Sequence, residues 1–470
     1  MAAARYSFLI PLIVGCTQFM HQFDGVSIAT ALPAMARSMD ADPLRLNLAI
    51  TCYLMALAVF VPVSGWMADR FGAKRIYLIA IVVFTASSLM CGFSQSLAEI
   101  VIFRTLQGIG GAMMTPVGRT IVMKTAPRSD MVKAITYITI PAAMAPLFGP
   151  SVGGFIVTYF SWPWIFYINL PIGLAGFLLV WWKIPDVDPE PRTKLDGAGF
   201  TLVASGIACL MLGFEVMGRG LLPAQAVGAL LLAGALCALV YVRRARKIDN
   251  PIIDLSLLKT RTFRASIAAG GLFYLGTTAF VFLITIMLQL GFGYSAFAAG
   301  ATTLAGALGS LLTRMIIRQL LSKLGFPRLL VLNGTLMVVY LIICAFIRPE
   351  MPIMLLLTIL FFGGFARSTQ FAAIQALAYA DMPRALMSRA TSFAAMAQLL
   401  CQSFGVGLAA LTIHLSLLWR GGTTLTPADI ATGFFMIAAA ALASLAMFAA
   451  LPANAGAALG PGAEDSGALK

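Results

Sequence analysis

The sequence predicts an all-α integral membrane protein that crosses the bilayer fourteen times. Of its 470 residues, 60% are hydrophobic and 11% are charged, and the mean hydropathy is +0.92. A soluble domain is about 45–50% apolar and about 25% charged. Fourteen apolar runs reach the length of about 17–25 residues that a membrane-spanning helix needs. Lysine and arginine gather in alternate loops between these runs.

The fourteen runs follow one another along the whole chain. They lie at residues 7–32, 44–67, 76–97, 99–122, 133–158, 164–184, 197–217, 223–242, 263–290, 296–317, 327–347, 352–379, 389–418 and 427–451. The first run follows Arg5 as a signal peptide would, but it is too long and thirteen more runs follow it. We therefore interpret it as a span.

The distribution of basic residues predicts the orientation. With fourteen spans, both termini lie on the same side of the membrane. Placing them in the cytoplasm puts 23 of the 32 Lys and Arg residues on the cytoplasmic side, 5 outside and 4 within spans. This is the positive-inside pattern. It accounts for the net charge of +14 without a nucleic-acid partner.

Two charged loops divide the spans into groups of six, two and six. Residues 184–196 hold three prolines among acidic residues, and residues 243–264 hold a basic run. Both compositions are typical of linkers. We expect an N-terminal six-helix bundle at 1–184, linkers with an extra helical hairpin at 185–262, a C-terminal six-helix bundle at 263–451 and a cytoplasmic tail at 452–470.

The two bundles share a loop pattern. The loops after the second span of each bundle, at 70–75 and 323–328, both have the order basic, apolar, Gly, two residues, Arg. Internal repeats of this kind are common in transporters. The pattern indicates related halves, although basic loops could also match by chance.

Residues for metal or covalent chemistry are scarce. His occurs only as His21 and His414, and the sequence has no HExxH or GxSxG motif on its spans. The seven cysteines lie in apolar stretches without a CxxC pair, which is typical of small membrane hydrophobes. We expect no enzyme, no metal and no cofactor other than protons as the coupling ion.

Asp24 is the acidic residue that the predicted spans place deep in the membrane. Burying a charge there costs about 2.5–3.5 kcal/mol on the insertion scale. Desolvation favours the protonated acid, whereas a nearby cation favours the carboxylate. A site balanced between the two can load and release protons. The alternative is a structural carboxylate that stays ionised.

Arg104 is the expected partner of Asp24. By residue count at 1.5 Å per residue, both lie about 8–12 Å below the outer surface. Gln107 and Gly108 share the helix face of Arg104. Arg104 could instead bond only carbonyl groups at a helix contact. His21 lies one turn before Asp24, where it could extend a proton path or act as a neutral hydrogen-bonding residue.

Small residues recur every fourth position in the fifth span, at Ala145, Gly149 and Gly153. Such a stripe lets helices approach closely, and Pro150 removes a helical hydrogen bond. The stripe indicates either tight packing alone or a seal between the halves.

Adaptable apolar side chains flank the polar positions and are candidates for the substrate lining. They are Met20, Phe23, Met113 and Met114. They could equally be core or lipid-facing residues. Arg119 and Arg367 also lie within spans; Arg119 can extend to the cytoplasmic surface, and the sequence assigns no role to Arg367.

Several motifs in order resemble the signatures of the major facilitator superfamily. They are Gly65–Arg75, with Gly65, Asp69, Arg70, Gly72, Lys74 and Arg75; Arg104–Ala112, with Arg104, Gln107, Gly108 and Gly110; Gly149–Gly154, with Gly149, Pro150, Gly153 and Gly154; and Asp24 ahead of Ala31–Pro33. The stretch Trp162–Gly173 is similar to the hallmark of the fourteen-helix drug:proton antiporters of the EmrB/QacA type. The resemblance covers essentially the whole chain.

The resemblance implies the fold and the function. It implies a proton-coupled multidrug exporter in the inner membrane that moves amphipathic small molecules by alternating access. The first motif would latch the outward-open state, and the third is similar to the antiporter motif. Substrates and membrane lipids are the expected partners, and the sequence does not determine a periplasmic adaptor. In the first span the residues after Asp24, at 25–29, depart from the family pattern.

Other functions stay open. An exporter of one metabolite or siderophore could use the same scaffold. A membrane enzyme is a remote alternative, because the spans carry no catalytic motif. A passive channel is equally remote, because it would not need a titratable Asp24.

Overall fold

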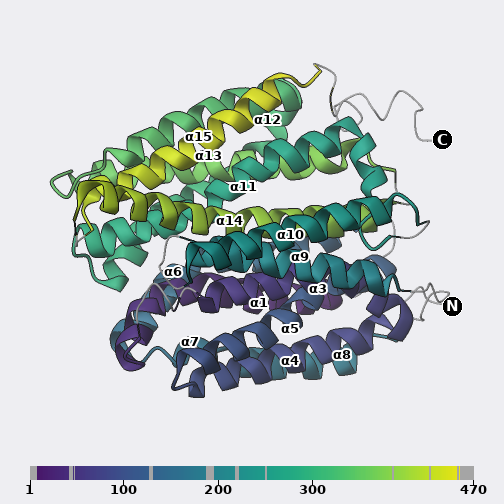
Figure 1. Cartoon of the computed structure of the whole chain (residues 1–470). Coiled ribbons are helices and arrows are strands. Elements are labelled where there is room, and N and C mark those ends of the chain that lie inside the picture. Colours follow the sequence, from purple (N-terminus) through teal and green to yellow (C-terminus); the bar gives the residue numbers. More distant parts are fainter. Residues whose placement is uncertain are drawn as a thin grey trace. The chain divides into compact units, whose positions relative to one another are not determined.

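The computed structural model describes residues 8–41, 46, 48–125, 131–186, 195–217, 222–248, 251–383, 386–422, 425–452 and 455. All the regular elements within these ranges are helices (Figure 1). The chain divides into two compact units. The first holds Met1–Ala208 with Ala296–Gly300, and the second holds Cys209–Ser295 with Ala301–Lys470.

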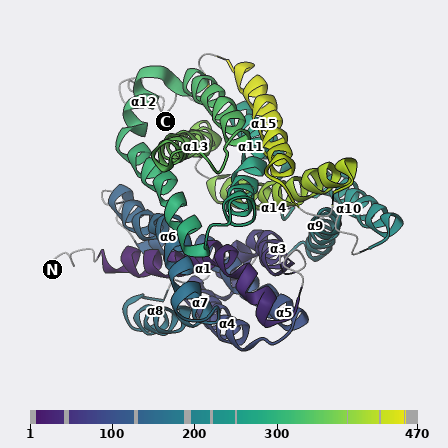
Figure 2. The ribbon, with the colours of Figure 1, turned by 90° about the vertical axis from the view of Figure 1, so that its left-hand side faces the viewer.

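The first unit is a bundle built around α1 and α5. Its helices are α1 (Leu9–Ser38), α3 (Leu48–Phe71), α4 (Ala73–Phe93), α5 (Leu97–Thr125), α6 (Met131–Tyr159), α7 (Trp164–Tyr167), α8 (Asn169–Lys183) and the first part of α9 (Gly197–Val216). α1 packs along α6, with α7 and α8 on its other side (Figure 2), while α5 packs against α3 and α4. α1 and α5 carry the two charged residues expected in the site.

The second unit is organised around α11. Its elements after α9 are α10 (Ala224–Ala245), the 3₁₀ helix η2 (Leu255–Lys259), α11 (Arg261–Ile286), the π-helix η3 (Met287–Gly291), α12 (Ala296–Ala345), α13 (Ile353–Ala380), α14 (Met387–Arg420) and α15 (Pro427–Ala449). α11 packs against α13, α14 and α15. α15 begins with a capping box between Thr426 and Asp429, which satisfies backbone groups at its first turn.

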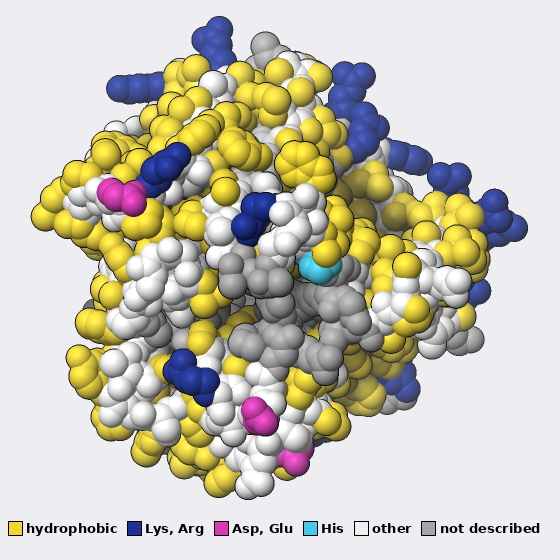
Figure 3. Space-filling view, turned by 60° about the vertical axis from the view of Figure 1, so that its left-hand side comes forward, with side chains coloured by type: hydrophobic (Ala, Val, Ile, Leu, Met, Phe, Trp, Pro, Cys, Tyr) yellow, Lys and Arg dark blue, Asp and Glu magenta, His cyan; other side chains and the backbone are white. Residues whose placement is uncertain are grey.

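Twelve helical segments among the described residues are long and apolar enough to cross a membrane. Large apolar side chains on them face outward, including Trp182 at 71% and Met354 at 72% exposure. Figure 3 shows hydrophobic side chains over much of the visible surface. At the end of α8 the Lys183 ammonium lies over the Trp182 ring. Exposed apolar flanks with aromatic and basic residues at helix ends are typical of lipid-facing surfaces.

Described residues of the expected linker at 243–264 form hydrogen bonds with α10 and at the start of η2. The backbone N–H of Ile253 donates to the Tyr241 hydroxyl oxygen at 2.7 Å, which ties the segment to α10. Asp254 caps η2 through the backbone N–H of Ser256. The side chains of α10 and of the following turn therefore hold a segment that linker composition would leave free.

The two expected loop repeats adopt the same backbone turn. Gly72 separates α3 from α4 with φ 92°, and Gly325 interrupts α12 with φ 70°. Only glycine adopts positive φ without steric cost. α12 is helical on both sides of Gly325, so the break between its two segments is a single residue.

Candidate functional site

Asp24 lies in the buried centre of the first unit and is held by three donors. Its side chain is 0% exposed. Arg104 Nη1 of α5 lies 2.5 Å from one carboxylate oxygen. The amide nitrogens of Gln107 and Asn169 donate to the other oxygen at 3.1 and 3.0 Å. α1, α5 and α8 therefore meet at one buried carboxyl group, and both of its oxygens accept hydrogen bonds.

Arg104 is held by both charge and aromatic faces. Its side chain is 0% exposed, and Nη1 also donates to the Gln107 side-chain oxygen at 2.7 Å. The guanidinium carbon lies 4.3 Å from the Tyr53 ring centroid and 5.7 Å from that of Phe166. Its Nε and Nη2 find no hydrogen-bond partner within the described ranges. The aromatic rings compensate part of the cation's lost hydration.

Glycines in α5 allow this approach. A Cβ at Gly108 would lie 2.5 Å from the Tyr53 carbonyl oxygen, and one at Gly110 would lie 2.7 Å from the Phe84 backbone nitrogen. Both positions therefore require glycine. The close contact of α5 with α3 and α4 sets Arg104 over the Tyr53 ring.

His21 joins the site through Tyr53 and not through a direct bond to Asp24. The Tyr53 hydroxyl is hydrogen-bonded to His21 Nδ1 at 2.6 Å, and the His21 side chain is buried. A Cβ at Gly111 would lie 2.9 Å from the same nitrogen, so glycine leaves room for the imidazole. A hydrogen bond, a cation–π contact and an ion pair thus connect His21, Tyr53, Arg104 and Asp24 in that order.

Two further buried residues belong to the site although the sequence did not single them out. The amide nitrogen of Asn169 bridges Asp24 and the Ser88 hydroxyl oxygen, at 2.9 Å from the latter, and Ser88 in turn donates to the Phe166 carbonyl. Asn169 lies in the stretch Trp162–Gly173 that carried part of the family resemblance. A polar amide within an apolar span was the available signal.

The small-residue stripe of α6 packs against α1 of the same unit. A Cβ at Gly153 would lie 2.6 Å from the Thr30 hydroxyl oxygen, and one at Gly149 would lie 3.2 Å from Val26. Ser27 donates to the Gly149 carbonyl. These contacts fix the helix that carries Asp24. A role of the stripe in sealing the two halves stays a prediction.

The first motif lies at the α3–α4 turn, away from the buried cluster. Asp69 lies 3.9 Å from Lys124, and Lys74 lies 3.7 Å from Asp186. The Arg70 guanidinium lies over the rings of Trp66 and Phe71. A Cβ at Gly65 would meet no described atom within 4 Å, so no close packing requires glycine there.

The four candidate lining residues are packed in the interior. Met20, Phe23, Met113 and Met114 are at most 7% exposed. Two cavities in the second unit are lined by other residues. Their role as substrate lining stays a prediction.

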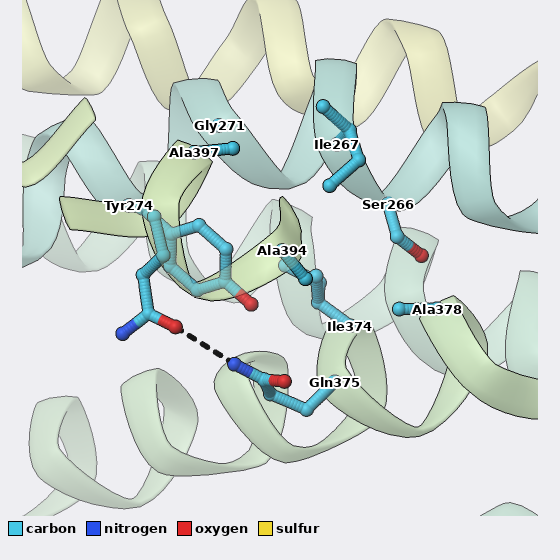
Figure 4. A pocket seen from close by; sticks show the side chains of 10 residues that line it. Ser266, Ile267, Gly271, Tyr274, Ile374, Gln375, Ala378, Ala394 and Ala397 are labelled. Carbon is cyan, nitrogen blue, oxygen red and sulfur yellow. Dashed lines mark hydrogen bonds between the residues drawn. The ribbon is translucent and has the colours of Figure 1, made fainter. Parts of the chain in front are cut away.

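One of these cavities lies between α11, α13 and α14 and has polar and apolar walls. Tyr274, Ser266 and Gln375 line it, and the Gln375 amide donates to the Gln398 side-chain oxygen at 2.8 Å (Figure 4). No group of three or more His, Cys, Asp or Glu side chains that could hold a metal ion occurs in the described ranges.

The family model and the similar sequences both indicate a membrane transporter. Residues 14–406 match the family model of the Major Facilitator Superfamily. The chain is 37% identical over 403 residues to the "Putative multidrug resistance protein MdtD" of Pectobacterium atrosepticum, covering 86% of both chains. It is 36% identical over 406 residues to the protein of the same name from Escherichia coli strain SMS-3-5, covering 86% of this chain and 85% of that protein.

Solved structures share the fold at low identity. The POT family transporter PepTSo has a TM-score of 0.71 and 15% identity, covering 95% of this chain and 98% of its own. A D-xylose–proton symporter has a TM-score of 0.69 and 15% identity, covering 96% and 99%.

The family and the apolar helices together define the class of protein. The chain is a multi-pass protein of the inner membrane and a transporter, not an enzyme. Its family model spans most of its length, and its relatives match it over 86% of its residues. It belongs to the Major Facilitator Superfamily.

Proposed function

We propose that this chain is a proton-coupled exporter that exchanges protons for amphipathic small molecules by alternating access. The observation that carries the proposal is the fully buried pair of Asp24 and Arg104, set where α1, α5 and α8 meet. The name of its MdtD relatives supports a multidrug substrate range. An intramembrane acid is functional more often than structural.

Proton binding at Asp24 would couple to helix movement. The ionised carboxylate attracts Arg104 and accepts bonds from Gln107 and Asn169. Adding a proton removes the charge attraction and one acceptor site, so the contact between α1, α5 and α8 weakens. Loss of that proton to the other side restores the contact. One charge moved across 100 mV supplies about 2.3 kcal/mol, or roughly a fifty-fold gradient.

The proposed membrane topology has fourteen spans with both termini in the cytoplasm. In this proposal α1, with 30 residues, and α6, with 29 residues, are two further spans in addition to the twelve candidate spans. The excess of basic residues in alternate loops supports the orientation. The bundles would comprise residues 1–184 and 263–451, with the extra hairpin between them.

The other motifs would control the conformational cycle. The α3–α4 turn, where Asp69 lies near Lys124, would latch the outward-open state. The tight α1–α6 contact at Gly149 and Gly153 would limit proton leak past Asp24. Protons would be the only coupling ion, and membrane lipids the constant partners.

An export panel tests the function. The chain is expressed in a host that lacks its own drug pumps, and retention of cationic, neutral and anionic dyes is measured with and without a protonophore. Lower retention of several dyes, reversed by the protonophore, is expected. No change for any dye, with export of one cell metabolite instead, would replace the multidrug proposal with a specific exporter on the same scaffold.

A further inference from the structure

Arg367 is a cation in the middle of α13 whose charge no described residue balances. α13 is a candidate membrane span, and Arg367 lies near its centre. The ion pairs that the structure describes in this unit, Arg389–Asp254 and Arg420–Asp429, involve other residues. Glu350 and Asp381 lie at the two ends of α13 and not beside its centre. A cation at this depth is costly without a partner.

The guanidinium has a free hydrogen-bonding edge. Its Nη1 is buried and has no hydrogen-bond partner within the described part of the chain. Its carbon lies 4.7 Å from the Phe280 ring centroid, which stabilises the cation's face but satisfies none of its N–H groups. Arg104 differs in charge balance, because the Asp24 carboxylate lies 2.5 Å from its Nη1.

The same guanidinium lines a cavity. The cavity is small, and Arg367 is the charged residue in its wall. α11, α12 and α15 supply the rest, including Thr277, Phe280, Met337 and Ile437. Ligand sites are typically apolar cavities with a few placed polar groups.

The Tyr340 hydroxyl is a second hydrogen-bond donor near Arg367. The Tyr340 ring packs on Phe280 with centroids 5.5 Å apart, so Phe280 contacts both Tyr340 and Arg367. Among the described residues, the buried Tyr340 hydroxyl finds no nitrogen or oxygen partner, and its partner is the Cys344 thiol, a weak one. Gly363 on α13 leaves room for this ring. Two donors therefore share one apolar environment.

We propose that this cavity binds the anionic group of a transported molecule, a carboxylate on an apolar or aromatic body, with Arg367 as its counter-ion. The planar fork of arginine matches a carboxylate in two parallel hydrogen bonds. One uncompensated cation matches one negative charge, and the apolar walls match the body of an amphiphile. The proposal rests on the transport function above and narrows its substrate class to include organic monoanions.

Binding of a matched pair of probes tests the proposal. The full chain in phosphatidylcholine nanodiscs is titrated with 2-naphthoate and with 2-naphthamide, which differ in charge but hardly in shape. We expect the carboxylate to bind at least about tenfold tighter, as hydrogen bonds to a charged group require. Arg367→Gln should abolish this preference while leaving 2-naphthamide binding intact, which also reports that the variant is folded.

Two further variants sharpen the result. Arg367→Lys keeps the charge and should retain part of the preference. Arg314→Gln removes an exposed arginine of α12 in the same unit and should retain all of it. Equal binding of both probes by the unchanged protein, or a full preference in Arg367→Gln, would overturn the proposal.

A lipid headgroup could use the same chemistry, and the lipid arm separates it. If phosphatidylglycerol in the nanodisc abolishes naphthoate binding, the cavity is a lipid site and the substrate assignment is wrong. Unchanged naphthoate affinity supports it. Binding needs no proton gradient, so the two proposals can fail separately. A preference for the carboxylate probe without any transport would refute only the proposed function. Transport without that preference would refute only the carboxylate site at Arg367.

Discussion

The contact between Asp24 and Arg104 predicts strong energetic coupling. Both side chains are 0% exposed, and their charged atoms lie 2.5 Å apart. Removing one member of a buried pair typically costs about 3–5 kcal/mol, because the other charge is left buried and unpaired. Arg104→Gln should therefore destabilise strongly, and the lost aromatic contact with Tyr53 at 4.3 Å adds to its cost.

The double variant should cost less than the sum of the singles. Asp24→Asn with Arg104→Gln replaces two charges by two amides that can still bond Gln107 and Asn169. We expect non-additivity of about 1–3 kcal/mol. The assay is unfolding in mixed detergent micelles at one pH, for the unchanged protein, both singles and the double.

A matched cycle controls for general destabilisation. Asp24→Asn combined with Arg420→Gln joins residues of different units, and Arg420 has its own partner in Asp429. That pair should add within ~0.5 kcal/mol. Additive losses for Asp24 and Arg104 as well would refute the view that their charges stabilise one another.

Two other predictions follow from contacts at α1 and η2. Gly153→Leu should abolish export by forcing α6 away from α1, at a cost of about 1–3 kcal/mol or more, because a Cβ alone would lie 2.6 Å from Thr30 Oγ1. The same change at Gly228, where a Cβ meets nothing within 4 Å, should leave export unchanged. Equal export by both variants would show that the α1–α6 contact is not needed for transport. Burial opposes ionisation of Asp254, but hydrogen bonds from Ser256 and Arg389 outweigh it and lower its pKa. The stabilisation is therefore present above the ordinary aspartate pKa and lost as pH falls through the lowered value. Asp254→Asn should lower the melting temperature at pH 7 by no more than about 2 °C, with a difference that disappears in acid; a constant difference down to acid pH would contradict the assignment.

Sequence patterns predicted the helices and the central pair because both depend on local or one-dimensional information. The length of an apolar run indicates a membrane span, and the number of residues from its end gives the depth of a side chain. Asp24 and Arg104 could therefore be placed at the same depth from the sequence alone. The glycine at 72 and that at 325 could also be matched, because positive φ at a helix junction selects glycine.

The remaining contacts depend on how helices pack. Asn169 is 145 residues from Asp24 in the chain, so no helical periodicity relates them. Tyr53 is an aromatic residue in an apolar span, and only the packing of α3 on α5 turns its ring toward Arg104. The burial of the four expected lining residues also depends on helix packing, and their role as substrate lining stays a prediction.

The central claim, that Asp24 carries the coupled proton, is tested most directly in proteoliposomes that contain a pH-sensitive dye. A dye substrate identified by the export panel is added to the unchanged protein, to Asp24→Asn and to Asp381→Asn, which alters an exposed acid after α13. We expect substrate-driven proton movement in the unchanged protein and in Asp381→Asn, and none in Asp24→Asn at equal amounts of folded protein. Proton movement in Asp24→Asn at the rate of the unchanged protein would contradict it.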